Sequence, residues 1–249
     1  MDFAGGIVVH ATAGTAALVT ALTLGKRRGF PKSITPPHSP ILTMIGASML
    51  WIGWFGFNAG SALGANGGAG MAMLVTHISA ATASLVWMFI EWRRFGKPSL
   101  IGIVTGMVAG LATVTPASGY IGVPGGLVLG FFGGLFCYLA VDYIRGKLQI
   151  DDSLDVFAVH GVGGILGTLL VAFLATSTFS GSGLAEGQTA FSQFFVQLKA
   201  VVLTVVWTSV FTYLILKITS FIVPLRVDEQ EEIEGLDLRS HGEKGYHSD

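Results

Sequence analysis

Two histidines, His10 and His160, lie inside apolar stretches of the sequence. Ionisable side chains in such stretches usually face the interior of a helix bundle or a cavity, because exposing them to lipid is costly. Two neutral imidazoles can satisfy each other, since one ring nitrogen donates a hydrogen bond and the other accepts it. Such a pair can take a proton from a weak acid and pass it on. For either histidine alone, a hydrogen bond to a neighbouring backbone or hydroxyl group is the alternative interpretation.

Aromatic residues crowd the end of another apolar stretch, where positions 51–61 read WIGWFGFNAGS. Helical periodicity divides their side chains between two faces. One face carries Trp54, Phe57 and Ser61, and the other carries Trp51, Phe55 and Asn58. Aromatic rings at this position are typical of a membrane interface. Rings beside a hydroxyl can also hold a small cation, because a ring face attracts positive charge. The residues alone leave both interpretations open.

Three aspartates, Asp2, Asp152 and Asp155, stand at the starts of predicted helices, where N-capping is the ordinary interpretation. His77 has no counterpart elsewhere in the chain, and we interpret it as structural. The sequence contains no cluster typical of a metal site, a phosphate-binding loop or a nucleophile–base–acid triad. It therefore predicts neither an enzyme nor a cofactor.

Seven apolar stretches position these residues. A bilayer core about 30 Å thick requires about 20 apolar helical residues. The predicted spans, of which the fourth is short, are 3–24, 40–62, 69–90, 99–116, 123–144, 154–175 and 197–223. Only 12% of the residues are charged and 51% are hydrophobic, whereas a soluble domain has about 25% charged residues. The sequence predicts an all-α, polytopic membrane helix bundle.

Basic residues gather near alternate connections between these spans. They are Lys26, Arg27, Arg28, Lys32, Arg93, Arg94, Lys97, Arg145 and Lys147. The other connections, near 63–68, 117–122 and 176–196, contain no Lys or Arg. The positive-inside rule therefore places the basic loops and the C-terminal tail in the cytoplasm. We expect a transmembrane domain over residues 1–225 and a cytoplasmic tail over 226–249, which its acidic composition alone would describe as disordered.

The first and sixth spans open alike. Asp2 precedes His10 by the same interval that separates Asp152 from His160, and glycine follows each histidine closely. The loop charges imply that these two spans cross the membrane in opposite directions. Similar motifs on oppositely directed helices are typical of inverted repeats, which commonly form a substrate path near the bilayer midplane.

These motifs resemble the ammonium transporter family (Amt/Mep/Rh), and most closely its Amt branch. The matching segments are DFAGGIVVH at 2–10, WFGFNAGS at 54–61, TPA at 115–117, DSLDVFAVHGVGG at 152–164 and EEIEGLDLRSHGE at 231–243. The resemblance covers essentially the whole chain. It implies an inverted-repeat fold of eleven helices, of which this chain resembles helices five to eleven. The family's first four helices have no counterpart, and we expect a truncated gene product or gene model.

The resemblance also implies roles for particular residues. It assigns the pore's twin histidines to His10 and His160, the outer vestibule or gate to Phe57 and Ser61, pore-wall positions to Trp54 and Thr115, and acidic positions to Asp2, Asp152 and Asp155. The implied activity is ammonium transport in the cell membrane. Ammonium loses its proton, and ammonia and the proton pass the histidines separately.

The partners implied by the resemblance are a homotrimer and a PII signal protein at the cytoplasmic face, with the tail in a regulatory role. The residues also allow two alternative functions. One is a non-transporting ammonium sensor or regulatory fragment, and the other is a membrane haem protein with His10 and His160 as axial ligands.

Overall fold

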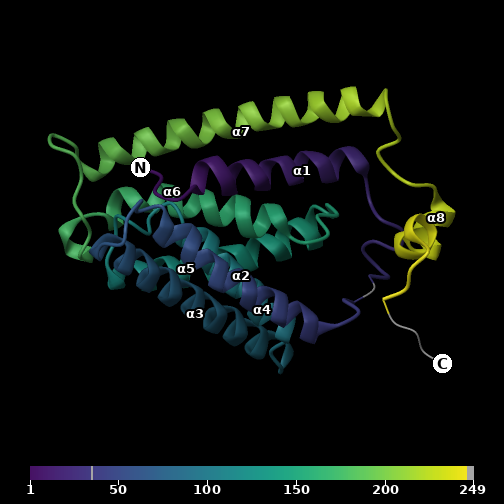
Figure 1. The fold of residues 1–249 in the computed structure, drawn as a ribbon, viewed down its shortest axis with the longest axis horizontal. Coiled ribbons are helices and arrows are strands. Elements are labelled where there is room, and N and C mark those ends of the chain that lie inside the picture. Colours follow the sequence, from purple (N-terminus) through teal and green to yellow (C-terminus); the bar gives the residue numbers. More distant parts are fainter. Residues whose placement is uncertain (35, 246–249) are drawn as a thin grey trace.

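The computed structural model of the chain describes residues 1–34 and 36–245, and over these residues it consists of helices and loops without a strand. In Figure 1 the helices α1 to α7 lie side by side in one bundle, and the short helix α8 lies at one end. Their bounds are α1 Thr12–Leu24, α2 Pro40–Gly60, α3 Gly67–Phe95, α4 Leu100–Val114, α5 Val123–Val141, α6 Val162–Leu174, α7 Ala190–Ser220 and α8 Glu229–Glu234. The predicted all-α bundle is confirmed. Residues 246–249 of the predicted tail lie outside the described residues.

Short turns of other helix types extend several of these elements. Three are π-helical turns beside longer helices, η1 Gly6–Ala11, η2 Asp142–Lys147 and η3 Phe157–Gly161. A 3-10 turn, η4 Ser177–Phe179, follows α6, and a π-helical turn, η5 Asp237–His241, lies in the tail. Turn η1 leads directly into α1, and η3 leads directly into α6. His10 and His160 therefore each lie in a π-helical turn at the start of a longer helix.

Six helical segments in the described part of the chain are long and apolar enough to cross a membrane. They are Gly6–Leu24, Pro40–Gly60, Gly67–Phe95, Val123–Lys147, Phe157–Leu174 and Ala190–Ser220. The fourth predicted span forms α4, which has only 15 residues. It is nevertheless deeply embedded, since most of its residues are buried. Helix α4 ends at Val114, two residues before Pro116, whose nitrogen cannot donate a backbone hydrogen bond.

Local sequence starts most of the long helices. Ser39, Asn66 and Ser99 cap α2, α3 and α4 by accepting hydrogen bonds from the backbone N–H groups of Leu42, Ala69 and Gly102. Thr189 forms a capping box with Ser192 at the start of α7. These side chains satisfy N–H groups that the first helical turn leaves free.

Glycine permits the close packing of α3, α4 and α5. A Cβ atom added to Gly130 of α5 would lie 2.6 Å from the backbone oxygen of Ser79 in α3. Gly110 of α4 approaches the same oxygen equally tightly, and its carbonyl accepts a hydrogen bond of 2.8 Å from the Ser79 hydroxyl. Small residues allow membrane helices to approach backbone to backbone. Gly130 therefore packs α5 directly against the backbone of α3.

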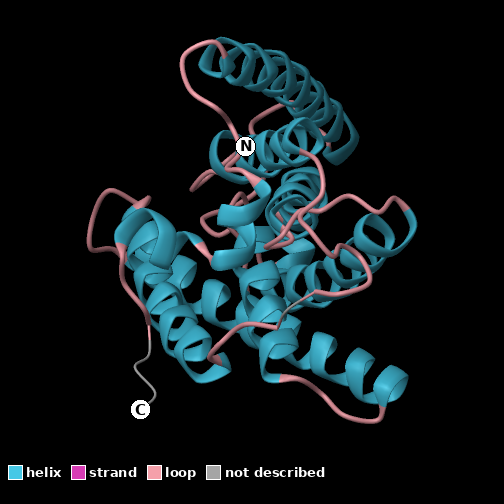
Figure 2. Ribbon diagram, turned by 90° about the vertical axis from the view of Figure 1, so that its right-hand side faces the viewer, coloured by secondary structure: helices cyan, strands magenta, loops and turns pink. Residues whose placement is uncertain are grey.

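Helix α7 lies at the edge of the bundle, uppermost in Figures 1 and 2, where it contacts α1 and α6. The buried amide of Gln197 donates a hydrogen bond of 3.0 Å to the backbone carbonyl of Thr168 in α6. The amide of Gln193 donates to the Gln197 side-chain oxygen, also at 3.0 Å. Gln197, supported by Gln193 within α7, therefore anchors a helix whose surface is otherwise mostly exposed.

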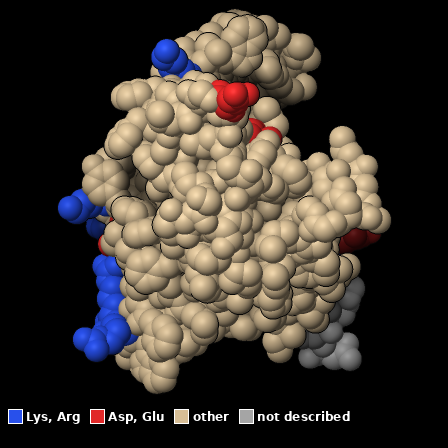
Figure 3. Space-filling model, turned by 90° about the vertical axis from the view of Figure 1, so that its left-hand side faces the viewer, with Lys and Arg blue, Asp and Glu red and all other residues tan. Residues whose placement is uncertain are grey.

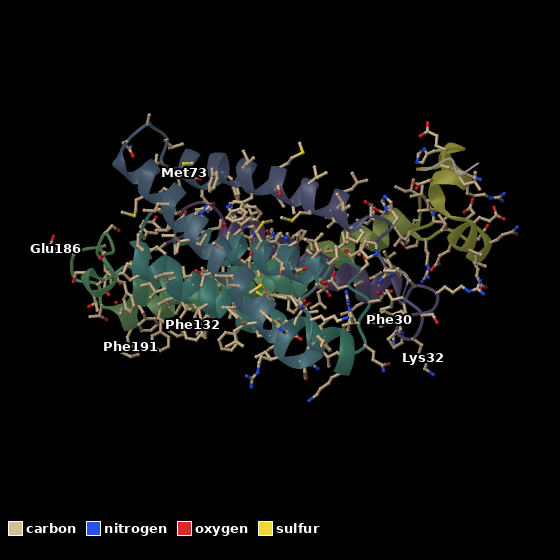
Figure 4. All side chains as sticks on the ribbon, turned by 90° about the horizontal axis from the view of Figure 1, so that it is seen from below. Phe30, Lys32, Met73, Phe132, Glu186 and Phe191 are labelled. Carbon is tan, nitrogen blue, oxygen red and sulfur yellow. The ribbon has the colours of Figure 1, made fainter. Side chains whose placement is uncertain are left out.

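The loops separate by charge between the two ends of the bundle. Figure 4 places Phe30 and Lys32 toward the end that carries the tail, and Glu186 and Phe191 at the opposite end. The latter end, which faces the viewer in Figure 3, is largely uncharged, with a few charged side chains near its edges. The basic loops thus share one end of the bundle with the tail.

We expect Gly130→Ala to destabilise the protein by about 1–3 kcal/mol, because the new methyl group must displace backbone that cannot withdraw. Gly46→Ala in α2 is the matched control, since nothing lies within 4 Å of its added Cβ. The control should be neutral or slightly stabilising. Thermal unfolding of both variants in detergent measures the effect, and equal melting temperatures would contradict this account of the packing.

Candidate functional site

The two histidine helices begin on carboxylate caps. Asp2 accepts a hydrogen bond of 3.0 Å from the backbone N–H of Ile7 in η1. Asp152 accepts one of 2.7 Å from the backbone N–H of Phe157 in η3. Each histidine follows within the same π-helical turn. The N-capping interpretation of these two aspartates therefore agrees with the structure.

These helices cross at glycines placed one turn after each histidine. A Cβ atom on Gly14 would collide with the backbone of Gly161 in the opposite helix. Reciprocally, a Cβ atom on Gly164 would lie 2.5 Å from the Cβ of His10. Helices α1 and α6 run in opposite directions (Figure 1). The contacts are therefore those of two equivalent elements related by an approximate two-fold axis.

The crossing brings the two imidazoles together. The Nδ1 atoms of His10 and His160 lie 3.2 Å apart, which is hydrogen-bond distance. The ring centroids are 5.2 Å apart and the ring planes are inclined by 29°. His10 is only 2% exposed, and its Nε2 atom has no hydrogen-bond partner among the described residues. One neutral ring can donate to the other, and one buried nitrogen remains for a small polar molecule.

Aromatic rings from α2 cover this pair. The Trp54 ring lies nearly parallel to both imidazoles, at 5.3 Å and 13° from His10 and at 6.4 Å and 16° from His160. Phe57 meets His10 edge-on, with ring centroids 6.2 Å apart. The indole N–H of Trp54 donates a hydrogen bond of 3.0 Å to the hydroxyl of Thr115, which is buried. Thr115 thus touches the histidine pair only through Trp54.

The second face of α2 contacts α3 instead of the histidine pair. Trp51 stacks on His77 of α3 at 5.1 Å, and Phe55 lies 6.1 Å from the same ring. The amide of Asn58 donates a hydrogen bond of 2.9 Å to the hydroxyl of Thr76. These residues lie outside the histidine cavity, so the division into two helical faces that the sequence indicates also separates two sites in space.

A cavity of about 410 Å³ opens beside the histidine pair. It is lined by Val9, His10, Ala13, Leu50, Gly53, Trp54, Phe57, Val156 and His160. Apart from the imidazoles and the indole, its walls are apolar. Such a cavity suits a small molecule that forms few hydrogen bonds and is attracted by aromatic faces.

Ser61 and Asp155, two other residues singled out by the sequence, do not line this cavity. The Ser61 hydroxyl donates to the backbone oxygen of Phe57 at the end of α2, at 2.8 Å. Asp155 forms an ion pair of 2.8 Å with Arg145 rather than a helix cap. Burial raises the pKa of Asp155 to about 6, against the opposing effect of Arg145. Asp155 lies instead in a second cavity, of about 350 Å³, which also includes Glu91.

Asp151, which no sequence motif singles out, ties the loop after α1 to the start of the His160 helix. Its carboxylate accepts a hydrogen bond of 2.7 Å from the backbone N–H of Arg27 and another of 2.7 Å from the guanidinium. Although burial opposes the shift, these bonds hold the pKa of Asp151 below its ordinary value. Its only signal in the sequence was its place beside Asp152 and opposite a basic loop.

The geometry does not fit the haem alternative. Two imidazole nitrogens that bind one metal from opposite sides lie about 4 Å apart, since each bond is about 2 Å long. The 3.2 Å between the two Nδ1 atoms leaves no room for a porphyrin.

Comparison with known proteins adds a family likeness to this geometry. The sequence profile of the Ammonium Transporter Family matches residues 1–246. The ammonium transporter Amt1 of Archaeoglobus fulgidus is 49% identical over 248 residues, which are 99% of this chain and 62% of the relative. An ammonium transporter of Aquifex aeolicus is 44% identical over 247 residues, 99% of this chain and 57% of the relative. The chain spans about three fifths of the length of these curated relatives.

Solved structures share the fold. One described as a sensor Amt protein matches with a TM-score of 0.88 and 30% identity, over 97% of this chain and 60% of its own. Mep2 of Saccharomyces cerevisiae matches with a TM-score of 0.81 and 35% identity, over 93% of this chain and 55% of its own.

Proposed function

The chain belongs to the ammonium transporter family, and from this premise we propose that it transports ammonium through a pore whose centre is the His10–His160 pair. The family is one of multi-pass membrane transporters rather than enzymes, which agrees with the long apolar helices of this chain. The observation that carries the proposal is the 3.2 Å contact between two imidazoles of antiparallel helices beside an apolar cavity.

The proposed mechanism follows from the chemistry of these groups. Ammonium arrives at the outer vestibule, where Phe57 and Ser61 lie at the end of α2 and Asp2 supplies a negative charge. Aromatic faces attract the cation, but the apolar cavity disfavours a charged occupant. Ammonium therefore releases its proton and continues as ammonia. The proton enters one imidazole and leaves from the other, since each ring has two nitrogens that exchange donor and acceptor roles.

Replacing both histidines, as His10→Ala and His160→Ala together, should reduce ammonium current at least about tenfold, because the proton loses its relay. His77→Ala is the matched control, since this imidazole also lies in an apolar helix but outside the cavity. Electrophysiology on reconstituted protein measures the current, normalised to the amount of protein. Full current in the double variant would exclude the relay.

A second candidate function is ammonium sensing without transport. It is favoured by one observation, that a structure with a TM-score of 0.88 to this chain is described as a sensor Amt protein. Uptake of methylammonium by a transporter-deficient host distinguishes the two functions. Uptake that depends on this chain supports transport, whereas saturable binding without uptake supports sensing.

We also propose that residues 226–249 form a cytoplasmic regulatory tail. Glu232 of α8 accepts hydrogen bonds from the backbone N–H of Arg28, at 2.8 Å, and from the guanidinium of Arg226, at 2.6 Å. Arg226 in turn donates to the backbone oxygens of Leu24 and Lys26, at 3.2 and 2.8 Å. Leu24 ends α1, which continues directly from the π-helical turn that contains His10. These bonds therefore connect the tail to one histidine helix.

Glu232→Ala should release the tail, increasing its cleavage by trypsin and lowering ammonium flux about twofold to fivefold. The effect is modest because solvent screens ion pairs at the protein surface. Glu186→Ala, at the opposite end of the bundle (Figure 4), controls for loss of one acidic residue. Unchanged cleavage would show that Glu232 does not hold the tail, and unchanged flux with increased cleavage would remove its regulatory role.

We further propose a homotrimeric assembly and binding of a PII signal protein at the end that carries the basic loops and the tail. Family membership supports both, and the wide apolar surfaces of α2 and α3 leave room for a protein neighbour. Native mass spectrometry of the detergent-purified protein should give the mass of three copies. The mass of a monomer would contradict the trimer. A failure to bind purified PII protein would contradict the proposed PII interaction.

A further inference from the structure

The α4 corner consists of the last two residues of α4 and the two that follow, 113–116. It contacts each element that carries a ring of the histidine site. Its connection to α2 is the hydrogen bond from the Trp54 indole to the Thr115 hydroxyl, at 3.0 Å. Its connection to the His10 helix is made by backbone, since the N–H of Ala4 donates to the Thr115 oxygen at 3.3 Å. The N–H of Phe3 likewise donates to the Pro116 oxygen at 2.9 Å.

The His160 helix packs against the same corner through glycines. A Cβ atom on Gly163 would lie 2.9 Å from the Thr113 hydroxyl oxygen, and one on Gly167 would lie 2.9 Å from Cγ of Pro116. Such contacts leave little freedom for the helix to shift. The corner therefore holds the two histidine helices and the indole in one common frame.

Within this frame the Thr115 hydroxyl has a fixed direction. It donates its hydrogen to the backbone oxygen of Leu111 at 2.7 Å and accepts the indole N–H of Trp54 on its oxygen. Thr115 has no exposed surface, so no solvent competes for either bond. A buried indole N–H that loses its acceptor must find another, and the walls beside Trp54 in the cavity are largely apolar.

The orientation of the Trp54 ring determines whether it attracts or repels a positive charge on a neighbouring imidazole. The face of an aromatic ring is negative and its edge is positive. With planes inclined by only 13° and 16° to the two imidazoles, Trp54 presents its face to both rings. A rotated indole would present its edge, which repels positive charge.

We propose that Thr115 is a positioning residue: its hydroxyl locks the Trp54 indole face-on to both imidazoles, so that a positive charge on either ring is stabilised as the proton passes. The effect on proton passage rests on the proposed transport function. The orientation of the indole by Thr115 does not depend on transport. Thr115 itself touches neither imidazole and acts through Trp54.

The geometric part is tested by structures of two variants of the full chain, Thr115→Val and Thr115→Ser. Valine keeps the shape of threonine but offers no acceptor, so the indole should turn away from its parallel position over His10. Serine keeps the hydroxyl and should keep the wild-type orientation. An indole that stays parallel in Thr115→Val would overturn the proposal, whatever the transport result.

The consequence is tested by a double-mutant cycle on ammonium current with Trp54→Leu. Thr115→Val alone should lower the maximal current about tenfold, the equivalent of one lost hydrogen bond. When Thr115→Val is combined with Trp54→Leu, the maximal current should fall by less than about twofold below that of Trp54→Leu alone. If Thr115 acts only through Trp54, its substitution has little further effect once the indole is gone. Thr115→Ser should restore most of the current.

Two results would refute the functional role of Thr115. One is an equal loss from Thr115→Val with and without Trp54, and the other is a loss in Thr115→Ser as large as that in Thr115→Val. An absence of current in the wild-type protein would instead defeat the proposed transport function, and the structures would still decide whether Thr115 orients the indole.

Discussion

The reciprocal crossing of the two histidine helices is the contact on which the rest of the site depends. Gly14 lets the His160 helix approach, and Gly164 lets the His10 helix approach. Only because both positions lack a side chain do the two Nδ1 atoms reach 3.2 Å. A methyl group at either place would force the helices apart and leave two imidazoles unpaired inside an apolar bundle, where an unsatisfied polar group is costly.

The surrounding elements serve to keep this crossing fixed. Carboxylate caps at Asp2 and Asp152 start the two helices at equivalent points. The α4 corner holds their flanks and, through Thr115, the indole that covers both rings. At the end of the bundle that carries the tail, Asp151 and Glu232 connect the loop after α1 and the tail to the same pair of helices. Polar bonds thus concentrate at helix ends, while glycine contacts hold the helix middles together.

Much of the fold and part of the site follow from sequence patterns. The seven apolar stretches each contain a helix, because their composition and length permit little else in a membrane. Helical periodicity separates the two aromatic faces of α2 correctly. Periodicity does not reveal that α4 stops at 15 residues, nor that Asp155 pairs with Arg145 instead of capping a helix. Helical periodicity describes the faces of one helix, whereas the end of α4 lies beside Pro116 and the Asp155 pair joins two separate elements.

What the sequence by itself determined is the class of the protein: an apolar, helical, multi-pass chain with two histidines in matching motifs. These properties follow from composition and local spacing, which act on each segment separately. Tertiary structure alone decided that the imidazoles meet through Nδ1, that Trp54 lies parallel to both, and that Thr115 anchors the indole. Those facts depend on the crossing of helices 150 positions apart in the chain, and helix propensity carries no information about which backbones come into contact.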